Sequence, residues 1–358
     1  MKSLAQVSRC DVPPTGVLCV ALAHNEMRRA PDFLRHHREL GVAHFFIVDD
    51  HSSDGTREYF QSQTDVTLFL PNGTTYKHHK ALWRKEILDA YALGRWVLLM
   101  DLDEQFIYPH CDSRSVDRFI AYLESERSEA VFAPMVEMYA DHSNASFADA
   151  NVQPLVQTFP FFDAEGYRLL RPSGRFLKKF PTPPLELLGG PRERLFYDFD
   201  VRSLNPLARW VLRTFSSLDR SMKTGALASL GDRFARLVLR GSMPRPPLVM
   251  SKIPLLKWRK GLQFPGGPHA VSDKLPLSEV WGALLHFKFM DFVNETKYRA
   301  ARGQHAKGAV HYKIYEEHIS TLDQNVSPYF SGSRRYGGWQ YLATCGLLRS
   351  TQKWDRFN

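Results

Sequence analysis

The stretch 94–108 constrains the fold most, because a short apolar run within it ends abruptly in three acidic residues. The run Trp96–Met100 follows a glycine and is too short for a typical helix, so it predicts a buried strand. Asp101, Asp103 and Glu104 come directly after it. A carboxylate loses several kcal/mol when it leaves water, so acids at the end of a buried strand usually have a partner.

Asp101 and Asp103 are the first candidates for a metal site. Residues two apart on a strand point to the same side, so both carboxylates can reach one ion. Oxygen ligands suit Mg²⁺ or Mn²⁺, which also binds the phosphates of a substrate. The same pattern is common where a strand simply runs into a polar loop, but the elements upstream favour the metal site.

Strands and helices alternate before this stretch. Strands are predicted at 16–23, 44–48 and 66–70, and helices at 31–40, 57–61 and 79–93. Pro31 and Gly41 are typical of the start and end of a helix. The alternating order predicts an α/β fold with a mainly parallel sheet flanked by helices.

Polar clusters fall at the ends of three predicted strands. His24-Asn25-Glu26 follows the first strand and Asp49-Asp50 the second, while the Asp101-x-Asp103 pair follows the fourth. Ligands of such sheets bind at the carboxyl ends of the strands, so these clusters predict one binding site.

The net charge of +9 indicates an acidic partner, namely nucleic acid, an anionic membrane or a phosphorylated ligand. We find no zinc-finger spacing, RNA-recognition signature or dense basic stripe, so we expect no nucleic-acid partner. The four cysteines are scattered, which favours reduced thiols in a cytoplasmic setting. No run approaches the roughly 20 apolar residues of a membrane span, so we expect a cytoplasmic protein that at most lies at the inner face of the membrane.

The segments Ala23–Glu26, Val48–Thr56 and Met100–Glu104 together resemble the nucleotide-sugar glycosyltransferases of the family 2 type, which have the Rossmann-like GT-A fold. The sequences of Leu40–Asp50 and Asp101–Pro109 more closely resemble a bacterial family 2-like branch, which is related to the family 92 transferases. The resemblance implies a sugar transfer from a nucleoside diphosphate sugar, with a UDP-sugar as the expected donor, to a carbohydrate or lipid-linked acceptor. It also implies Mn²⁺ or Mg²⁺, inversion at the anomeric carbon and a role in polysaccharide biosynthesis.

The resemblance covers most of 16–200 and resumes around 247–290, and it assigns roles to single residues. The donor-binding residues that it implies are Ala23, Asn25, Glu26, Asp49, Asp50 and Asp101. Asp49 and Asp50 match the acidic pair that holds the base and ribose, and carboxylates do accept hydrogen bonds from a uracil N–H or ribose hydroxyls. Asp101 and Asp103 match the metal-binding motif.

Lys80 and Arg84 lie on the predicted helix that faces the donor in such enzymes. They would neutralise the diphosphate, Arg84 through a bidentate contact. A solvated basic helix face explains the same pattern equally well.

Three carboxylates are candidates for the base that deprotonates the acceptor. Glu137 lies in the apolar strand 130–139, and a half-buried carboxylate there has a raised pKa suited to base chemistry. Strand alternation also allows an outward-facing Glu137. Asp141 at the strand end and Glu193 in the turn 189–194 are the other two, and the sequence does not separate them.

Arg192 and Arg194 follow a Gly-Gly pair, and a similar segment occurs in the resembling branch. Together with backbone N–H groups, they could hold a phosphate or an anionic sugar. The alternative is a surface turn with a basic edge.

His286 lies in an apolar run, where a lone histidine is usually a hydrogen-bonded core residue. The resembling enzymes often supply a late histidine as a metal ligand, so His286 is expected as the third ligand, with His269 in reserve. Lys288 is two residues on and would meet the diphosphate if this segment is a strand.

The segment 204–245 contains two short amphipathic helices, at 207–215 and 232–240, with arginines and aromatic residues. They either lie on an anionic membrane, with Trp210 and Phe215 inserted, or pack on the core with basic solvent faces. The expected organisation is an N-terminal tail 1–15, a GT-A core 16–203, this insertion 204–245, a part completing the active site 246–330, and a C-terminal wrap 331–358.

Two other functions are compatible with these features. A nucleotidyltransferase would share the metal and nucleotide contacts but release pyrophosphate. A non-catalytic protein would use the basic surface to bind an anionic polymer or membrane.

Overall fold

The computed structural model describes residues 1–8, 11–141, 154–172, 174–196, 205–215, 226–239, 248–265, 267–302, 312, 315–316 and 328–357. Its largest sheet is formed by β1 (Leu4–Gln6), β2 (Leu18–Ala23), β3 (His44–Asp49), β4 (Val66–Pro71), β5 (Trp96–Asp101), β6 (Glu104–Ile107), β7 (Ala130–Glu137), β11 (Ser251–Lys257) and β12 (Ala283–His286). Within the described residues, these nine strands lie in the order β1-β4-β3-β2-β5-β11-β7-β12-β6.

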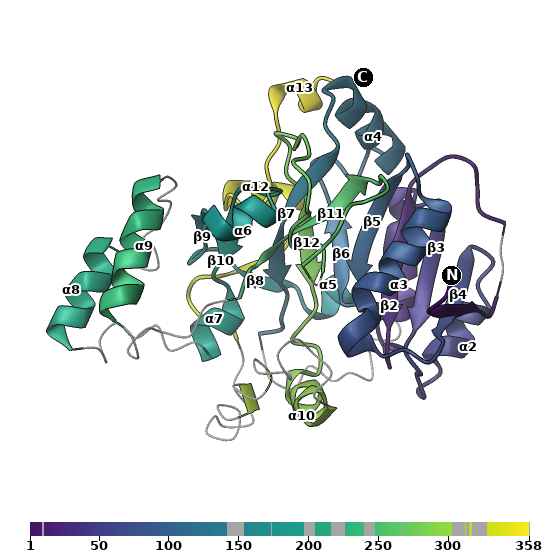
Figure 1. The fold of residues 1–358 in the computed structure, drawn as a ribbon, viewed down its shortest axis with the longest axis horizontal. Coiled ribbons are helices and arrows are strands. Elements are labelled where there is room, and N and C mark those ends of the chain that lie inside the picture. Colours follow the sequence, from purple (N-terminus) through teal and green to yellow (C-terminus); the bar gives the residue numbers. More distant parts are fainter. Residues whose placement is uncertain are drawn as a thin grey trace.

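The sheet is mixed but mostly parallel. Strands β2 to β5 pair in parallel, as the alternating pattern predicted. β7 and β12 share this direction, because β11 runs antiparallel to both β5 and β7 while β12 is parallel to β7. β1 and β6 are antiparallel to their neighbours at the two edges. The sheet and its flanking helices are compatible with a Rossmann-like α/β fold (Figure 1).

The start and stop predicted for the first helix agree with the structure, whereas the third helix begins earlier than predicted. Helix α1 (Ala30–Leu40) carries proline in its first turn and ends at Gly41, which has φ 99°. Such a left-handed conformation favours glycine, and it confirms the predicted stop. Helix α3 (Tyr76–Tyr91) starts before the predicted residue 79, and Leu82 is exposed, whereas Trp83 and Leu88 are buried.

Helices of the N-terminal part of the chain pack against the large sheet. α1 packs against β6, α2 (Thr56–Gln61) packs against β4, and α3 packs against β2. Helix α4 (Val116–Ser125) connects β6 to β7, and Ser115 caps it by accepting a hydrogen bond from the Arg118 N–H. This cap satisfies one of the free N–H groups at the helix start.

Smaller elements complete the body. They are β8 (Phe161–Asp163), β9 (Arg168–Leu170), β10 (Glu186–Leu188), β13 (Ser333–Arg335), α5 (Leu155–Thr158), α6 (Gly174–Lys179), α7 (Pro191–Phe196), α10 (Phe292–Arg302), α12 (Trp339–Thr344) and α13 (Gln352–Asp355). β9 pairs with β10, and β13 pairs with β8. The buried Trp354 of α13 contacts Tyr122 of α4, so the C-terminal segment does return to the core.

Helices α8 (Pro206–Phe215) and α9 (Ala226–Val238) lie side by side at one end of the molecule, away from the large sheet (Figure 1). α9 begins six residues before the predicted start at 232. The two helices share a small core of their own, formed by Ala208, Val211, Leu212, Ala235 and Leu239. We call this unit the α8–α9 pair.

Among the described residues, no helix is both long and apolar enough to cross a membrane.

Candidate functional site

A cavity of about 490 Å³ opens where several strands of the large sheet end. Ala23 at the end of β2, Asp101 at the end of β5 and His286 at the end of β12 all line it. Helix α10 forms another part of the wall, α3 contributes Tyr76 and Lys80, and α7 contributes Arg192. This is the sheet edge at which the sequence placed a binding site, and a cavity of this size is typical of small-molecule sites.

Most of the residues predicted for the site line this cavity. They are Ala23, Asn25, Glu26, Asp50, Lys80, Asp101, Asp103, Arg192, His269, His286 and Lys288. Arg84 lies behind the wall and donates a hydrogen bond of 2.8 Å to Asp101. Asp49 is fully buried and contacts the Arg57 guanidinium at 3.1 Å, so it holds the loop after β3 rather than facing the cavity.

Asp103, Glu104 and His286 form a group that could hold a metal ion. One ligand atom of each lies within 4.8 Å of the others, and all three residues are buried. Within the described residues this group contains Glu104 rather than the predicted Asp101. The reason is that β5 ends at Asp101 and the chain turns before β6, so the strand spacing that would align Asp101 with Asp103 stops there.

The donor set fits a divalent cation. Two carboxylates and one imidazole are a donor set that can coordinate a divalent cation. His286 Nε2 lies 3.4 Å from Asp103 Oδ2, and its Nδ1 lies 3.6 Å from Glu137 Oε1. A carboxylate behind the second ring nitrogen is the common way to orient a metal-binding histidine. Glu137 therefore lies where a carboxylate could orient the imidazole.

Asp101 belongs to a different charged group, which the sequence did not reveal. The Lys252 ammonium lies 2.6 Å from Asp101 Oδ2 and 2.6 Å from Glu104 Oε1. Burial alone would lower the pKa of Lys252, but the two carboxylates raise it above its ordinary value. One feature of the sequence could have indicated this group: Lys252 is the one charged residue in the largely apolar segment 248–256, and a buried lysine usually has an acidic partner.

His269 lines the cavity but lies outside the metal group of the described residues. Its Nδ1 donates to the Ser251 carbonyl oxygen at 2.8 Å. Burial, together with the nearby Lys252 charge, lowers the pKa of His269 to about 4. The ring is therefore neutral at ordinary pH and suited to hydrogen bonding.

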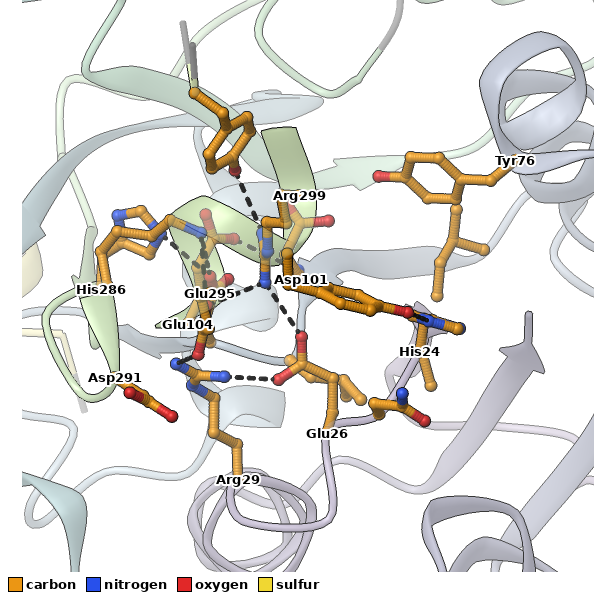
Figure 2. A pocket seen from close by; sticks show the side chains of 18 of the residues that line it. His24, Glu26, Arg29, Tyr76, Asp101, Glu104, His286, Asp291, Glu295 and Arg299 are labelled. Carbon is orange, nitrogen blue, oxygen red and sulfur yellow. Dashed lines mark hydrogen bonds and ion pairs between the residues drawn. The ribbon is translucent and has the colours of Figure 1, made fainter. Parts of the chain in front are cut away.

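A second charged network joins the first strand end to α10. Arg29 contacts both Glu26 and Glu295, and Arg299 contacts the same two carboxylates. Figure 2 shows these four side chains facing one another at the cavity wall. Burial raises the pKa of Glu26, although Arg29 and Arg299 oppose the shift.

Helix α10 also contacts the mouth of the cavity. Tyr298 forms a hydrogen bond of 2.7 Å with His24 Nε2, and Arg302 pairs with Asp50 at 2.9 Å. The predicted nucleotide-binding acid Asp50 thus already has a cationic partner from α10. None of these α10 residues was predicted for the site, because tyrosines interleaved with basic residues on a helix usually just cover a surface.

The lowered pKa of Tyr312 indicates a positive electrostatic potential inside the cavity. Burial would raise the pKa of this phenol, but Lys288, Arg299 and Arg192 lower it to about 8. The Arg299 guanidinium lies 3.1 Å from the Tyr312 hydroxyl, and Lys288 Nζ lies 5.5 Å from the ring centre. Cations that stabilise a phenolate would equally stabilise a bound phosphate.

The predicted base candidates do not line the cavity among its described residues. Glu137 is fully buried and contacts Arg192, and its pKa is lowered because Arg192 and His286 outweigh the effect of burial. The expected raised pKa of Glu137 is therefore wrong, since the cationic partners come from distant segments. Glu193 is also buried and is held 2.6 Å from Arg168.

The remaining two predicted residues lie elsewhere. Asp141 is exposed just beyond the end of β7. Arg194 contacts Asp163 at 3.0 Å and stacks on Phe330, so it joins α7 to the C-terminal segment. The turn at Gly189 and Gly190 leads directly into α7, and both glycines have positive φ.

The structure is an α/β fold, compatible with a Rossmann-like one, with a charged cavity whose buried Asp-Glu-His group could hold a metal ion. No protein-family model matches the chain, and no curated protein matches it either.

Proposed function

We propose that this protein is a metal-dependent glycosyltransferase that moves a sugar from a nucleoside diphosphate sugar to a carbohydrate or lipid-linked acceptor. The observation that carries the proposal is the group Asp103, Glu104 and His286 in the same cavity as Lys288 and the other cations around Tyr312. A divalent cation beside fixed cations suits a diphosphate, which carries several negative charges. The resemblance of the strand-end motifs to family 2 transferases adds UDP as the expected nucleotide and inversion as the expected outcome.

The cavity residues divide into three tasks under this proposal. Asn25 and Asp50 are placed for the nucleoside, because both line the cavity beside β2 and offer hydrogen-bond acceptors. Lys288, Arg299 and Arg192 are placed for the diphosphate. A cation bound by Asp103, Glu104 and His286 would offset the negative charge that develops on the leaving group.

Asp291 is the carboxylate that we assign to deprotonating the acceptor. It lines the cavity, and its cationic partner is Arg28, whose side chain is 56% exposed and 3.1 Å away. The other acids of the cavity wall are paired with mostly buried cations, which occupy their oxygen atoms with charge-assisted contacts. Asp291 therefore replaces the three candidates taken from the sequence.

The first test is the thermal stability of the purified protein with UDP, GDP, CDP and dTDP, each with and without Mn²⁺. A ligand that binds only the folded protein stabilises it by about 2.7 kcal/mol at a hundred times its dissociation constant. We expect a metal-dependent rise in melting temperature with one nucleotide. Asp103→Asn should abolish this rise, because it removes a ligand of the metal.

A matched control is Asp65→Asn, which breaks the Arg38–Asp65 pair of 2.6 Å at the surface. This variant should keep the nucleotide effect. No stabilisation by any nucleotide at millimolar concentration would overturn the proposal. Release of pyrophosphate rather than nucleoside diphosphate during turnover would identify a nucleotidyltransferase instead.

A further inference from the structure

The α8–α9 pair exposes an unusual number of large apolar side chains. Leu207 is 66% exposed and Trp210 is 56% exposed on α8, and Leu230, Phe234 and Leu237 are exposed on α9. We call these five residues the apolar patch. Single exposed apolar residues are normal on a protein surface, but a contiguous group of this kind marks an interaction site.

The apolar patch is continuous across the two helices. Leu230, Phe234 and Leu237 have the spacing of one helical face. The Phe215 ring lies 5.6 Å from the Trp210 ring and 4.7 Å from the Phe234 ring, measured between centroids. Phe215 itself is partly buried against the small core of the pair, so Phe234 rather than Phe215 is the second exposed aromatic residue.

This part of the chain also carries most of the net positive charge. The segment 204–245 contains eight lysines and arginines and two aspartates, which accounts for six of the nine net positive charges. Arg233 is exposed beside Phe234, and a Cβ atom on Gly174 would lie 3.9 Å from its guanidinium. Gly174 begins α6, where Arg175, Lys178 and Lys179 are exposed, so the basic surface continues onto that helix.

We propose that the α8–α9 pair docks onto an anionic lipid bilayer. Trp210, Phe234 and the leucines of the apolar patch enter the boundary between headgroups and acyl chains, and the surrounding cations contact lipid phosphates. Amphipathic helices that combine aliphatic and aromatic residues with lysine and arginine bind membranes in this way. The inference rests on the surface of the pair and is independent of the glycosyltransferase proposal.

A second copy of this chain and a nucleic acid fit the surface of the α8–α9 pair less well than a bilayer does. A second copy of this chain would bring two strongly positive segments together, and like charges at an interface oppose association. A nucleic-acid backbone would satisfy the cations but leave exposed leucine side chains without an apolar partner. An anionic bilayer satisfies both features, because it offers phosphates at its surface and hydrocarbon just beneath.

The test is sedimentation of the full chain with vesicles of phosphatidylcholine alone or mixed with phosphatidylglycerol. We expect sedimentation with the anionic vesicles and release at high salt. The double substitution Trp210→Ser/Phe234→Ser should weaken the partition roughly tenfold or more, since each side chain loses the transfer of a large apolar surface. Leu237→Ser tests the same patch through a smaller change and should weaken binding less.

The matched control is Leu93→Ser, which replaces a leucine that is 51% exposed outside the apolar patch. It should bind vesicles like the unchanged protein. Because all the replaced side chains are exposed, circular dichroism should show that each variant is folded. The proposal fails if the unchanged protein does not sediment with anionic vesicles, or if the patch variant and the control bind equally. It also fails if light scattering shows a dimer that the patch variant lacks, because the patch would then bind a second copy.

Discussion

The cavity and the α8–α9 pair depart from the usual distribution of side chains in opposite directions. At the cavity, Lys252 and Glu104 are almost fully buried. On the pair, Leu207 and Trp210 are largely exposed. Charged groups are rarely buried without partners, and large apolar groups are rarely exposed together. The cavity satisfies its buried charges within the chain, through the Lys252–Glu104 pair, whereas the α8–α9 pair leaves its apolar side chains exposed.

The two regions also differ in how they are held. Charges at the cavity are anchored to the large sheet, with Lys252 on β11 and Glu104 on β6. The pair depends on a core of a few small and medium side chains that is separate from the main core. A ligand at the cavity would thus meet a rigid framework, whereas the pair can respond locally without disturbing the sheet.

The largest effect should come from removing the buried lysine. Lys252→Met leaves Glu104 buried without its ammonium partner, and we expect a loss of about 3 kcal/mol in the free energy of unfolding. Lys257→Met on the same strand is the control, because Lys257 pairs with Glu124 at 3.0 Å in a largely solvated setting. That variant should lose less than about 0.5 kcal/mol. Urea unfolding of both variants measures the difference, and equal losses would show that the cavity charges are not structurally coupled to the sheet.

A second pair of variants tests whether the two regions unfold separately. Leu98→Ala removes a fully buried side chain of β5, and it should lower the main unfolding free energy by about 3 kcal/mol. Leu212→Ala removes a side chain from the core of the α8–α9 pair. It should increase hydrogen exchange in 206–215 and 226–238 and lower the main transition by less than about 1 kcal/mol. If Leu212→Ala shifted the main transition as much as Leu98→Ala, the pair would be part of the same cooperative unit.

The smallest effect concerns pH. His37 is fully buried, donates through Nδ1 to the Phe33 carbonyl oxygen at 2.8 Å, and accepts through Nε2 from the Phe106 N–H at 3.3 Å. Burial, and then the neighbouring His36, hold the pKa of His37 well below its ordinary value of 6.5. The unfolded chain binds a proton there more readily, so stability is complete above about pH 6.5 and falls as the pH drops toward the lowered folded value.

His37 should contribute a slope of about 1 kcal/mol per pH unit below that point, and His37→Asn should reduce the total slope by this amount. Unfolding free energies measured between about pH 7 and pH 5 test this. No histidine occurs in 204–245. Acid should therefore leave the protection of amides against hydrogen exchange, relative to the intrinsic rate at each pH, unchanged in the α8–α9 pair, while this protection falls in the sheet. Parallel acid effects in both regions would contradict the comparison.

Local patterns in the sequence were enough to predict strands β2 to β5 and the end of the sheet at which the cavity lies. The apolar runs that became β2 to β5 have polar residues directly after them, and Asp50, Asp101 and Asp103 do meet at one cavity. His286 was also placed correctly beside Asp103, at 3.4 Å. These predictions depended on features within a few residues of each site.

The partners of those residues could not be predicted in the same way. Lys252 reaches Asp101 across the sheet because β11 inserts between β5 and β7, and no local pattern records such an insertion. Glu137 was expected to be a base with a raised pKa, but Arg192 arrives from a separate helix and reverses the shift. The antiparallel direction of β6 likewise depends on its pairing with β12 far along the chain.

The contacts of α10 with the cavity mouth have a consequence for selectivity. Arg302 holds Asp50, and Arg299 holds Glu26, so a molecule that binds these acids or cations must exchange its own charges or hydroxyls for existing ion pairs. A neutral, purely apolar molecule that separated one of these ion pairs would leave both of its members unsatisfied, at a cost of several kcal/mol. We therefore expect the entrance to admit charged or hydroxyl-rich molecules more readily than apolar ones of the same shape.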